Sequence, residues 1–94
     1  MQQTNIMFCL PEKLIVYPNP ANYYVFADLS SITKPNWGDY SLVFFDSNGR
    51  VVIEIDQFDY ILTRVSLNNL RNGMYYYVIF KNGQRIEANK LIIY

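Results

Sequence analysis

Residues 40–55, YSLVFFDSNGRVVIEI, determine the fold class of this 94-residue chain. Two runs rich in β-branched and aromatic residues, 40–46 and 50–55, flank the dipeptide Asn48-Gly49. This arrangement is the strongest short-range signal for a β-hairpin, because a type I′ turn needs positive φ at both central residues. The middle of the chain is therefore predicted to be two antiparallel strands joined by a tight turn.

Short β runs separated by turn signals continue on both sides of this hairpin. Pro18-Asn19-Pro20 ends a first run, because proline has no backbone N–H and a fixed φ, and Asn82-Gly83 marks a second hairpin. No stretch of helical length has a 3.6-residue period. The predicted strands are 14–17, 23–29, 40–46, 50–55, 61–67, 74–81 and 84–94, and residues 30–39 are predicted to be a loop.

Alternation within these runs indicates which side chains face a common core. Strands of this length, separated by turn signals every ~8–12 residues, are typical of an all-β, antiparallel β-sandwich of about seven strands. The predicted inward-facing residues are Val25, Ala27, Leu29, Leu42, Phe44, Tyr75, Tyr77 and Ile79.

The first twelve residues differ from the rest because they lack periodicity and end in Pro11-Glu12. We interpret 1–12 as a linker or the tail of an upstream region, and 13–94 as one domain. Cys9 is the only cysteine, which excludes an intramolecular disulfide. The apolar runs are far shorter than the ~20 residues of a membrane span. No signal peptide is recognisable, so for an exported protein we expect it upstream of this sequence.

Composition and charge argue against nucleic-acid binding, catalysis and metal binding. The chain has eight basic and eight acidic residues and no histidine. A nucleic-acid partner is not expected, because such binders carry a clustered basic face. Without histidine, the usual general base, the Ser-His and Cys-His nucleophile pairs and the commonest zinc ligand are missing. We expect no enzyme activity, no cofactor and no metal. Weak calcium signals at 46–49 and at Asp56 and Asp59 lack further ligands.

Aromatic residues make up 17% of the chain and allow a competing hypothesis. An exposed aromatic platform stacks against sugar rings, which is typical of a carbohydrate-binding or adhesion module. The alternative, which we favour, is that these side chains fill a thin core and cover its outer faces. The candidate platform residues are Tyr24, Phe26, Trp37, Tyr40 and Tyr76.

Four stretches taken together resemble one family. Residues 17–22, YPNPAN, are similar to its opening "YPNPA" segment, and 42–52, LVFFDSNGRVV, to its middle hairpin with a Gly-Arg pair. Residues 65–79, VSLNNLRNGMYYYVI, match its "L…L..G.Y" segment, and 90–94, KLIIY, its short basic-then-apolar terminal strand. This family is the C-terminal sorting domain of the type IX (Por) secretion system, and the resemblance covers about residues 14–94.

The resemblance implies an immunoglobulin-like sandwich that acts as a secretion signal. Cargo upstream of the domain passes through the periplasm and is recognised, through this domain, by the outer-membrane translocon. A sortase-like peptidase then removes the domain, within or near residues 1–13, and attaches the cargo to the cell surface, or the cargo is secreted. The motif residues carried over are Pro18, Asn19, Pro20, Gly49, Arg50, Gly73, Tyr75, Lys90, Leu91, Ile92 and Ile93.

Physical reasoning assigns roles to some of these motif residues. The prolines are expected to set the bend between the first two strands, with contact to the translocon as the alternative. Arg50 is expected to pair with Asp46 or a terminal carbonyl, with recognition as the alternative, and Tyr75 to lie in the core. A final strand at a sheet edge docks a partner by β-augmentation, so we expect residues 90–94 to carry much of the recognition. An exposed edge of this kind also allows an edge-strand homodimer.

Overall fold

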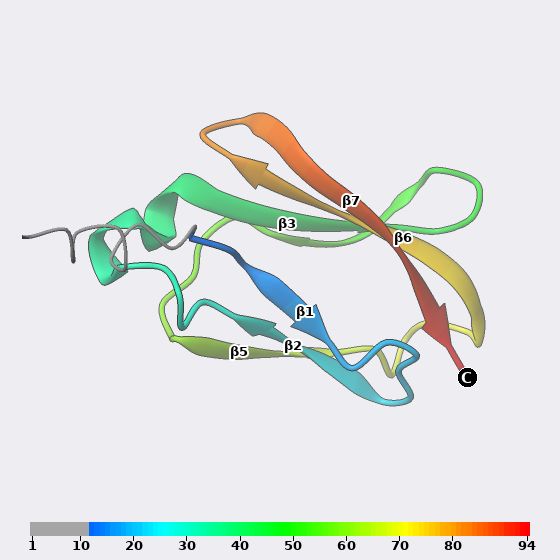
Figure 1. Ribbon diagram of the computed structural model, residues 1–94. Coiled ribbons are helices and arrows are strands. Elements are labelled where there is room, and N and C mark those ends of the chain that lie inside the picture. The colour runs from blue at the N-terminus through cyan, green and yellow to red at the C-terminus, as the bar shows by residue number, and fades with distance from the viewer. Residues whose placement is uncertain (1–11) are drawn as a thin grey trace, which may run out of the picture.

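The computed structural model describes residues 12–94, which form a two-layered β-sandwich (Figure 1). Within these described residues, seven strands and one short 3₁₀ helix follow one another. Each strand begins and ends within one residue of its predicted bounds. The elements are β1 (Ile15–Tyr17), β2 (Tyr24–Asp28), η2 (Lys34–Asp39), β3 (Tyr40–Phe45), β4 (Val51–Ile55), β5 (Leu62–Ser66), β6 (Gly73–Lys81) and β7 (Gln84–Ile93).

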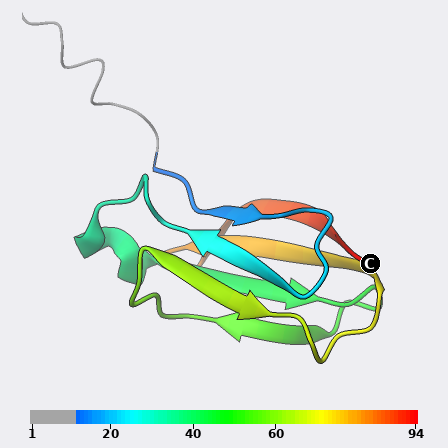
Figure 2. The same ribbon diagram turned by 90° about the horizontal axis from the view of Figure 1, so that it is seen from below.

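The strands are distributed over two antiparallel sheets. One sheet has the order β1-β2-β5 and the other the order β4-β3-β6-β7, so β7 lies at a sheet edge as predicted. After β1 the chain leaves the first sheet and makes a parallel bridge from Ala21 to Ile93 of the second. Figure 2 shows the resulting layers from below. The predicted antiparallel sandwich is confirmed.

The core lies between the two sheets and is built from alternate residues of nearly every strand. All of the predicted inward-facing residues belong to it, and Val25, Ala27 and Leu29 are fully enclosed. Burying one large apolar side chain stabilises the fold by about 1.5–3 kcal/mol, so this cluster is the main source of stability. Its members are Leu14, Val16, Ala21, Val25, Ala27, Leu29, Ile32, Tyr40, Leu42, Phe44, Phe58, Val65, Leu67, Tyr75, Tyr77, Ile79, Leu91 and Ile93.

The two Asn-Gly dipeptides form different turns, which corrects the prediction for the first. At the second, Asn82 and Gly83 both have positive φ, 53° and 81°, as a type I′ turn requires. At the first, only Gly49 has positive φ, and its N–H donates to the carbonyl of Asp46 at 3.0 Å. This is a three-residue loop with glycine in the left-handed conformation, and a register shift at Phe44/Phe45 accompanies it.

Residues 34–39 were predicted to belong to a loop but form the 3₁₀ helix η2. Pro35 lies in its first turn, where a missing N–H costs nothing. The indole N–H of Trp37 donates to the carbonyl of Ile32 at 2.9 Å and holds the helix against the sandwich. Because a 3₁₀ helix this short has no amphipathic period, periodicity alone does not reveal it.

Candidate recognition surface

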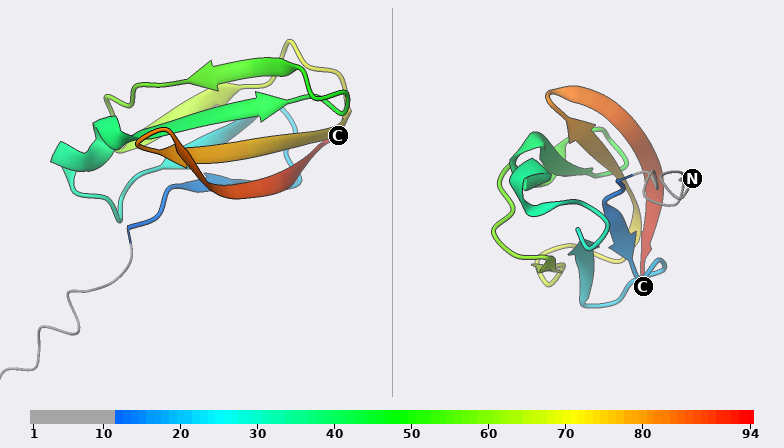
Figure 3. Two further views of the ribbon diagram at one scale, coloured as in Figure 1. Left: turned by 90° about the horizontal axis from the view of Figure 1, so that it is seen from above. Right: turned by 60° about the vertical axis from the view of Figure 1, so that its left-hand side comes forward.

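Segments far apart in the sequence meet at one end of the sandwich. This end, which we call the motif end, holds residues 17–22, the turn at 46–49, residues 67–75 and the terminal residues 90–94 (Figure 1). Ala21 bridges to Ile93, Gly73 pairs with Ile93, and the N–H of Leu67 donates to the carbonyl of Tyr23 at 2.8 Å. The described part of the chain begins at the opposite end, on the side of η2 (Figure 3), where Glu12 contacts Thr33 and Asn36.

Asn19 joins the opening segment to the last strand. Its side-chain amide donates to the carbonyl of Lys90 at 2.6 Å, and its side-chain oxygen accepts the N–H of Ile92 at 3.2 Å. Two backbone bonds continue the contact: the N–H of Ala21 donates to the carbonyl of Ile92, and the N–H of Tyr94 to the carbonyl of Ala21, at 2.8 and 3.0 Å. We call these four hydrogen bonds the Asn19 clamp.

The sequence Pro18-Asn19-Pro20 explains why a side chain is needed here. Neither proline has a backbone N–H, so the segment cannot offer a regular ladder of donors to the edge of β7. A carboxamide presents one donor and one acceptor in a plane, as a peptide group does. The Asn19 side chain therefore replaces the missing peptide group, and a carboxylate in its place has no donor for the carbonyl of Lys90.

The terminal residues divide into a buried and an exposed set. Leu91 and Ile93 point into the core, whereas Lys90, Ile92 and Tyr94 are exposed. The backbone edge that Ile92 presents away from β6 is already occupied by the Asn19 clamp. The predicted β-augmentation along 90–94 is therefore revised, because a partner strand there would have to displace residues 19–21.

Gly73 and Tyr75 have structural roles at the start of β6. Gly73 has φ of 151°, a conformation that side-chain-bearing residues avoid, and it begins the strand where a tight turn was predicted. Tyr75 is buried, as predicted, and its hydroxyl donates to the carbonyl of Arg71 at 2.7 Å. This bond to the backbone just upstream is the tyrosine corner of immunoglobulin-like sandwiches.

The Gly49-Arg50 pair belongs to a turn organised by Asp46. One carboxylate oxygen accepts the backbone N–H groups of Asn48 and Arg50, and the other accepts the guanidinium Nε of Arg50 at 3.0 Å, which confirms the predicted pair. These contacts, the Arg50 N–H first, lower the pKa of Asp46. Both carboxylate oxygens of Asp46 therefore stabilise the turn. Among residues 12–94 no group of three or more metal-ligating side chains occurs.

At the opposite end, a network of polar contacts ties the chain to the loop before η2 and to η2 itself. The Glu12 carboxylate accepts the backbone N–H and hydroxyl of Thr33 and the side-chain amide of Asn36, at 3.1–3.2 Å. The backbone hydrogen bond from Thr33 is the main reason why the pKa of Glu12 lies below its usual value. Ser31 exchanges two hydrogen bonds with the backbone of Lys13. We call these contacts the Glu12 network.

A family model described as a secretion system C-terminal sorting domain matches residues 15–94, which include all four motif segments. The chain belongs to this family. It is therefore a type IX sorting signal, part of a cargo protein that interacts with the type IX machinery and is exported to the cell surface or secreted. No curated protein matches the chain. Within the described residues, no helix has the length and apolarity to cross a membrane.

The aromatic residues of the competing hypothesis are spread over the sorting domain. Tyr40 is only 1% exposed, and Trp37 is half-buried against Ile32. Tyr24 and Phe26 lie on the outer face of the three-stranded sheet, with ring centroids 5.2 Å apart. Tyr76 lies on the outer face of the other sheet, so the five residues do not form one platform.

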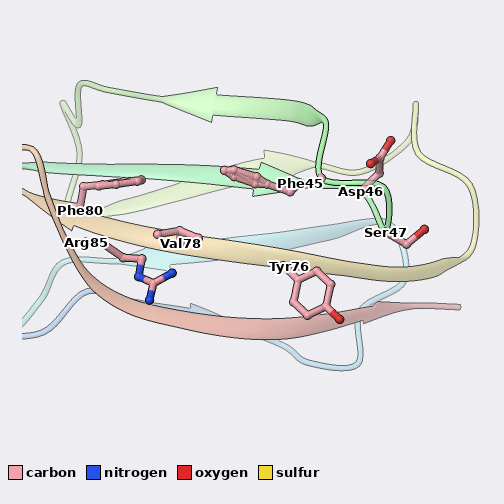
Figure 4. A pocket seen from close by; sticks show the side chains of 8 residues that line it. Phe45, Asp46, Ser47, Tyr76, Val78, Phe80 and Arg85 are labelled. Carbon is pink, nitrogen blue, oxygen red and sulfur yellow. The ribbon is translucent and has the colours of Figure 1, made fainter.

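The outer face of the four-stranded sheet of the sorting domain is hollowed. Phe45, Tyr76, Val78, Phe80 and Arg85 line a depression of about 420 Å³ that reaches the turn at 46–49 (Figure 4). Sequence reasoning did not single out this hollow. Its signal was present in β6, which is apolar on both faces, because in a two-layered sandwich the second sheet covers only one face of each strand.

Proposed function

We propose that the motif end of this sorting domain is the surface that the outer-membrane translocon recognises. One observation carries the proposal: the four segments of the family resemblance all reach the end opposite Glu12, with residues 17–22, the turn 46–49 of the middle hairpin, residues 67–75 and residues 90–94. The upstream cargo joins the domain at the Glu12 end. The motif end is thus the part of the domain that an attached cargo covers least.

The chemistry of the exposed motif residues supports recognition by side chains. Lys90 offers a cation, and Ile92 and Tyr94 offer apolar surface that is 37% and 62% exposed. Leu91 and Ile93 hold these three residues in place by packing into the core. Pro18, Asn19 and Pro20 hold the strand edge through the Asn19 clamp.

The domain acts as a ligand and a substrate in this proposal, and it performs no catalysis itself. Cargo crosses the periplasm before it meets the translocon, and a sortase-like peptidase then cleaves within or near residues 1–13 and attaches the cargo to the surface. The hydrogen bonds of Glu12 and Lys13 support this cleavage position. Peptide bonds within the sandwich are protected because their residues are fixed by such contacts, so a peptidase is expected to cut at or before the start of the sandwich, on the side of the cargo.

An export assay tests the proposal. A periplasm-targeted fluorescent reporter is fused to the 94-residue chain and expressed in a bacterium that has the type IX machinery, and in a secretion-deficient mutant of it. We expect the reporter at the surface or in the medium of the competent strain alone. A folded domain that keeps the reporter in the periplasm of both strains contradicts the proposal.

Charge reversal at the two ends then maps the surface. We expect Lys90→Glu to lower export by about tenfold, the cost of reversing one charged contact in an interface. Lys34→Glu is the matched control, because Lys34 is exposed on η2 at the Glu12 end. Equal export of both variants, with circular dichroism spectra like that of the native chain, contradicts recognition at the motif end. Deleting 90–94 is less informative, since it removes Leu91 and Ile93 from the core.

A further inference from the structure

The outer face of the four-stranded sheet is built from rows that cross all of its strands. Directly paired residues share a face, and the core positions Leu42 and Phe44 define the inner one. We call the other side the four-stranded face. Its three rows are Val51-Phe45-Tyr76-Lys90, then Glu54-Val43-Val78-Ala88, then Ser41-Phe80-Arg85.

The centre of the four-stranded face is apolar, and its hollow has no side chain to fill it. Phe45, Val78 and Phe80 line the floor, and Tyr76 stands beside them with 41% of its surface exposed (Figure 4). A continuous apolar area of this kind on a small domain is typical of an interaction surface.

Charges of opposite sign lie at the two edges of this face. Glu54 projects from the edge strand β4, and Lys90 and Arg85 project from the edge strand β7. Among residues 12–94, the side chains of these three residues make no hydrogen bond or ion pair with one another or with any other described side chain. Each has its charge available for a partner.

The outer face of the three-stranded sheet is different, because its charges are already used. Arg64 lies over the ring of Tyr24, 4.7 Å from the centroid. Asp28 accepts the backbone N–H of Ser30 at 2.8 Å and the hydroxyl of Tyr17 at 3.4 Å. Of the two outer faces formed by residues 12–94, the four-stranded face alone combines an apolar centre with charges at both edges that make no contact with a described side chain.

We propose that the four-stranded face binds the same face of a second copy of this chain. A two-fold axis parallel to the strands places the β4 edge of each copy over the β7 edge of the other. The row of Glu54 lies between the rows of Lys90 and Arg85, so each Glu54 then faces two cations of its partner. An axis across the strands would place like charges together, so the charges select the first arrangement. Two sheets stacked in this way pack as aligned layers.

The size of the face indicates a weak dimer. Four strands at the usual spacing and three rows give a projected area of roughly 400 Å² per copy. A standard interface buries about 800 Å² per partner, so we expect a dissociation constant on the order of 100 µM.

Sedimentation equilibrium of the 94-residue chain, with a reductant to keep Cys9 reduced, measures this constant. We expect Tyr76→Arg to weaken the dimer by more than about tenfold, because it places an uncompensated charge at the centre of the apolar contact. Tyr60→Arg is the matched control: Tyr60 is 71% exposed and lies outside the four-stranded face, so we expect no change. Circular dichroism checks that both variants are folded.

A charge cycle identifies the arrangement. Arg85→Glu is expected to weaken the dimer about threefold in the native chain, and to strengthen it by a similar factor in a Glu54→Lys chain. Within one copy these residues are three strands, about 14 Å, apart, beyond the screening length of about 8 Å at physiological salt. If the effect of Arg85→Glu on the dissociation constant changes sign between the two backgrounds, residues 54 and 85 interact between copies. Both residues are exposed, so replacing them leaves the core intact.

Three results overturn the proposal. The first is a chain that stays monomeric up to about 1 mM, ten times the expected constant. The second is a dimer that Tyr76→Arg leaves unchanged, as an edge-to-edge dimer would be. The third is an Arg85→Glu effect of the same sign in both backgrounds. All three results come from sedimentation of the isolated chain, so they are independent of the export assay. Arg85 and Glu54 also lie outside the motif end, so the charge cycle does not alter the proposed recognition surface.

Discussion

The short strand β1 is held at both of its ends, and the two attachments are chemically different. After β1, the Asn19 clamp joins the opening segment to β7 through neutral amide groups, and it connects the two sheets. Before β1, the Glu12 network joins the chain to residues 31–36 through a carboxylate, two hydroxyl side chains and the amide of Asn36. A strand of three residues has few ladder hydrogen bonds, so these contacts decide how firmly it is held.

The chemical difference makes the two attachments respond differently to pH. The clamp fixes the exposed residues of the motif end, and its amide groups do not titrate at any pH that a bacterium meets. The strength of the Glu12 network, at the opposite end, depends on an ionised carboxylate. The Asn19 clamp is therefore independent of pH, whereas the Glu12 network at the opposite end loosens in acid.

The largest expected effect is the loss of the clamp. Asn19→Ala removes two hydrogen bonds and is expected to lower the free energy of unfolding by about 2 kcal/mol, measured by urea denaturation. Asn36→Ala is the matched control at the other end, and we expect a loss of about 0.5 kcal/mol, because the other contacts of Glu12 remain. Equal losses for the two variants would remove the distinction between the ends.

A smaller effect is expected at the tyrosine corner of the motif end. Tyr75→Phe keeps the buried ring and removes one hydrogen bond to the carbonyl of Arg71, so we expect a loss of about 1 kcal/mol. Tyr60→Phe serves as the control, because Tyr60 is mostly exposed. Thermal unfolding distinguishes the two variants, and an unchanged midpoint for Tyr75→Phe would show that the corner contributes nothing to stability.

The smallest effect concerns pH. Because hydrogen bonds from Thr33 and Asn36 lower the pKa of Glu12 in the folded state, the unfolded chain takes up the proton first as the pH falls. The stability contributed by ionised Glu12 is present above its ordinary pKa of about 4.3, and it is lost as the pH falls through the lower folded-state value. The difference between the native chain and Glu12→Gln should therefore be constant at neutral pH and shrink below about pH 4.3.

Measurements over the same pH range also test the Asn19 clamp. The stability difference between the native chain and Asn19→Ala should stay constant across this range, because neither clamp partner titrates. Denaturation curves at several pH values measure both differences. A clamp difference that fell in parallel with that of Glu12 would mean that the two attachments unfold together.

Much of the fold was predictable from local patterns. Alternation located the inward residues of β2, β3 and β6, and turn residues marked the strand ends within one position. The predictions that failed were the turn at Asn48-Gly49 and the loop at 34–39. At the first, the carboxylate of Asp46 binds the turn N–H groups and stabilises a longer loop. At the second, a contact between Trp37 and Ile32 stabilises a helix too short to have a period.

The sequence by itself determined the all-β class, the strand bounds, the inward-facing residues and the four motif segments, because these depend on neighbours within a few positions. Only the tertiary structure decided that Asn19 binds β7 more than 70 residues away, and that Leu91 and Ile93 are core while Lys90 and Ile92 are exposed. It also decided that Glu54 and Arg85 lie at opposite edges of one face. These relations depend on the order of strands in a sheet, which long-range packing sets and no local pattern encodes.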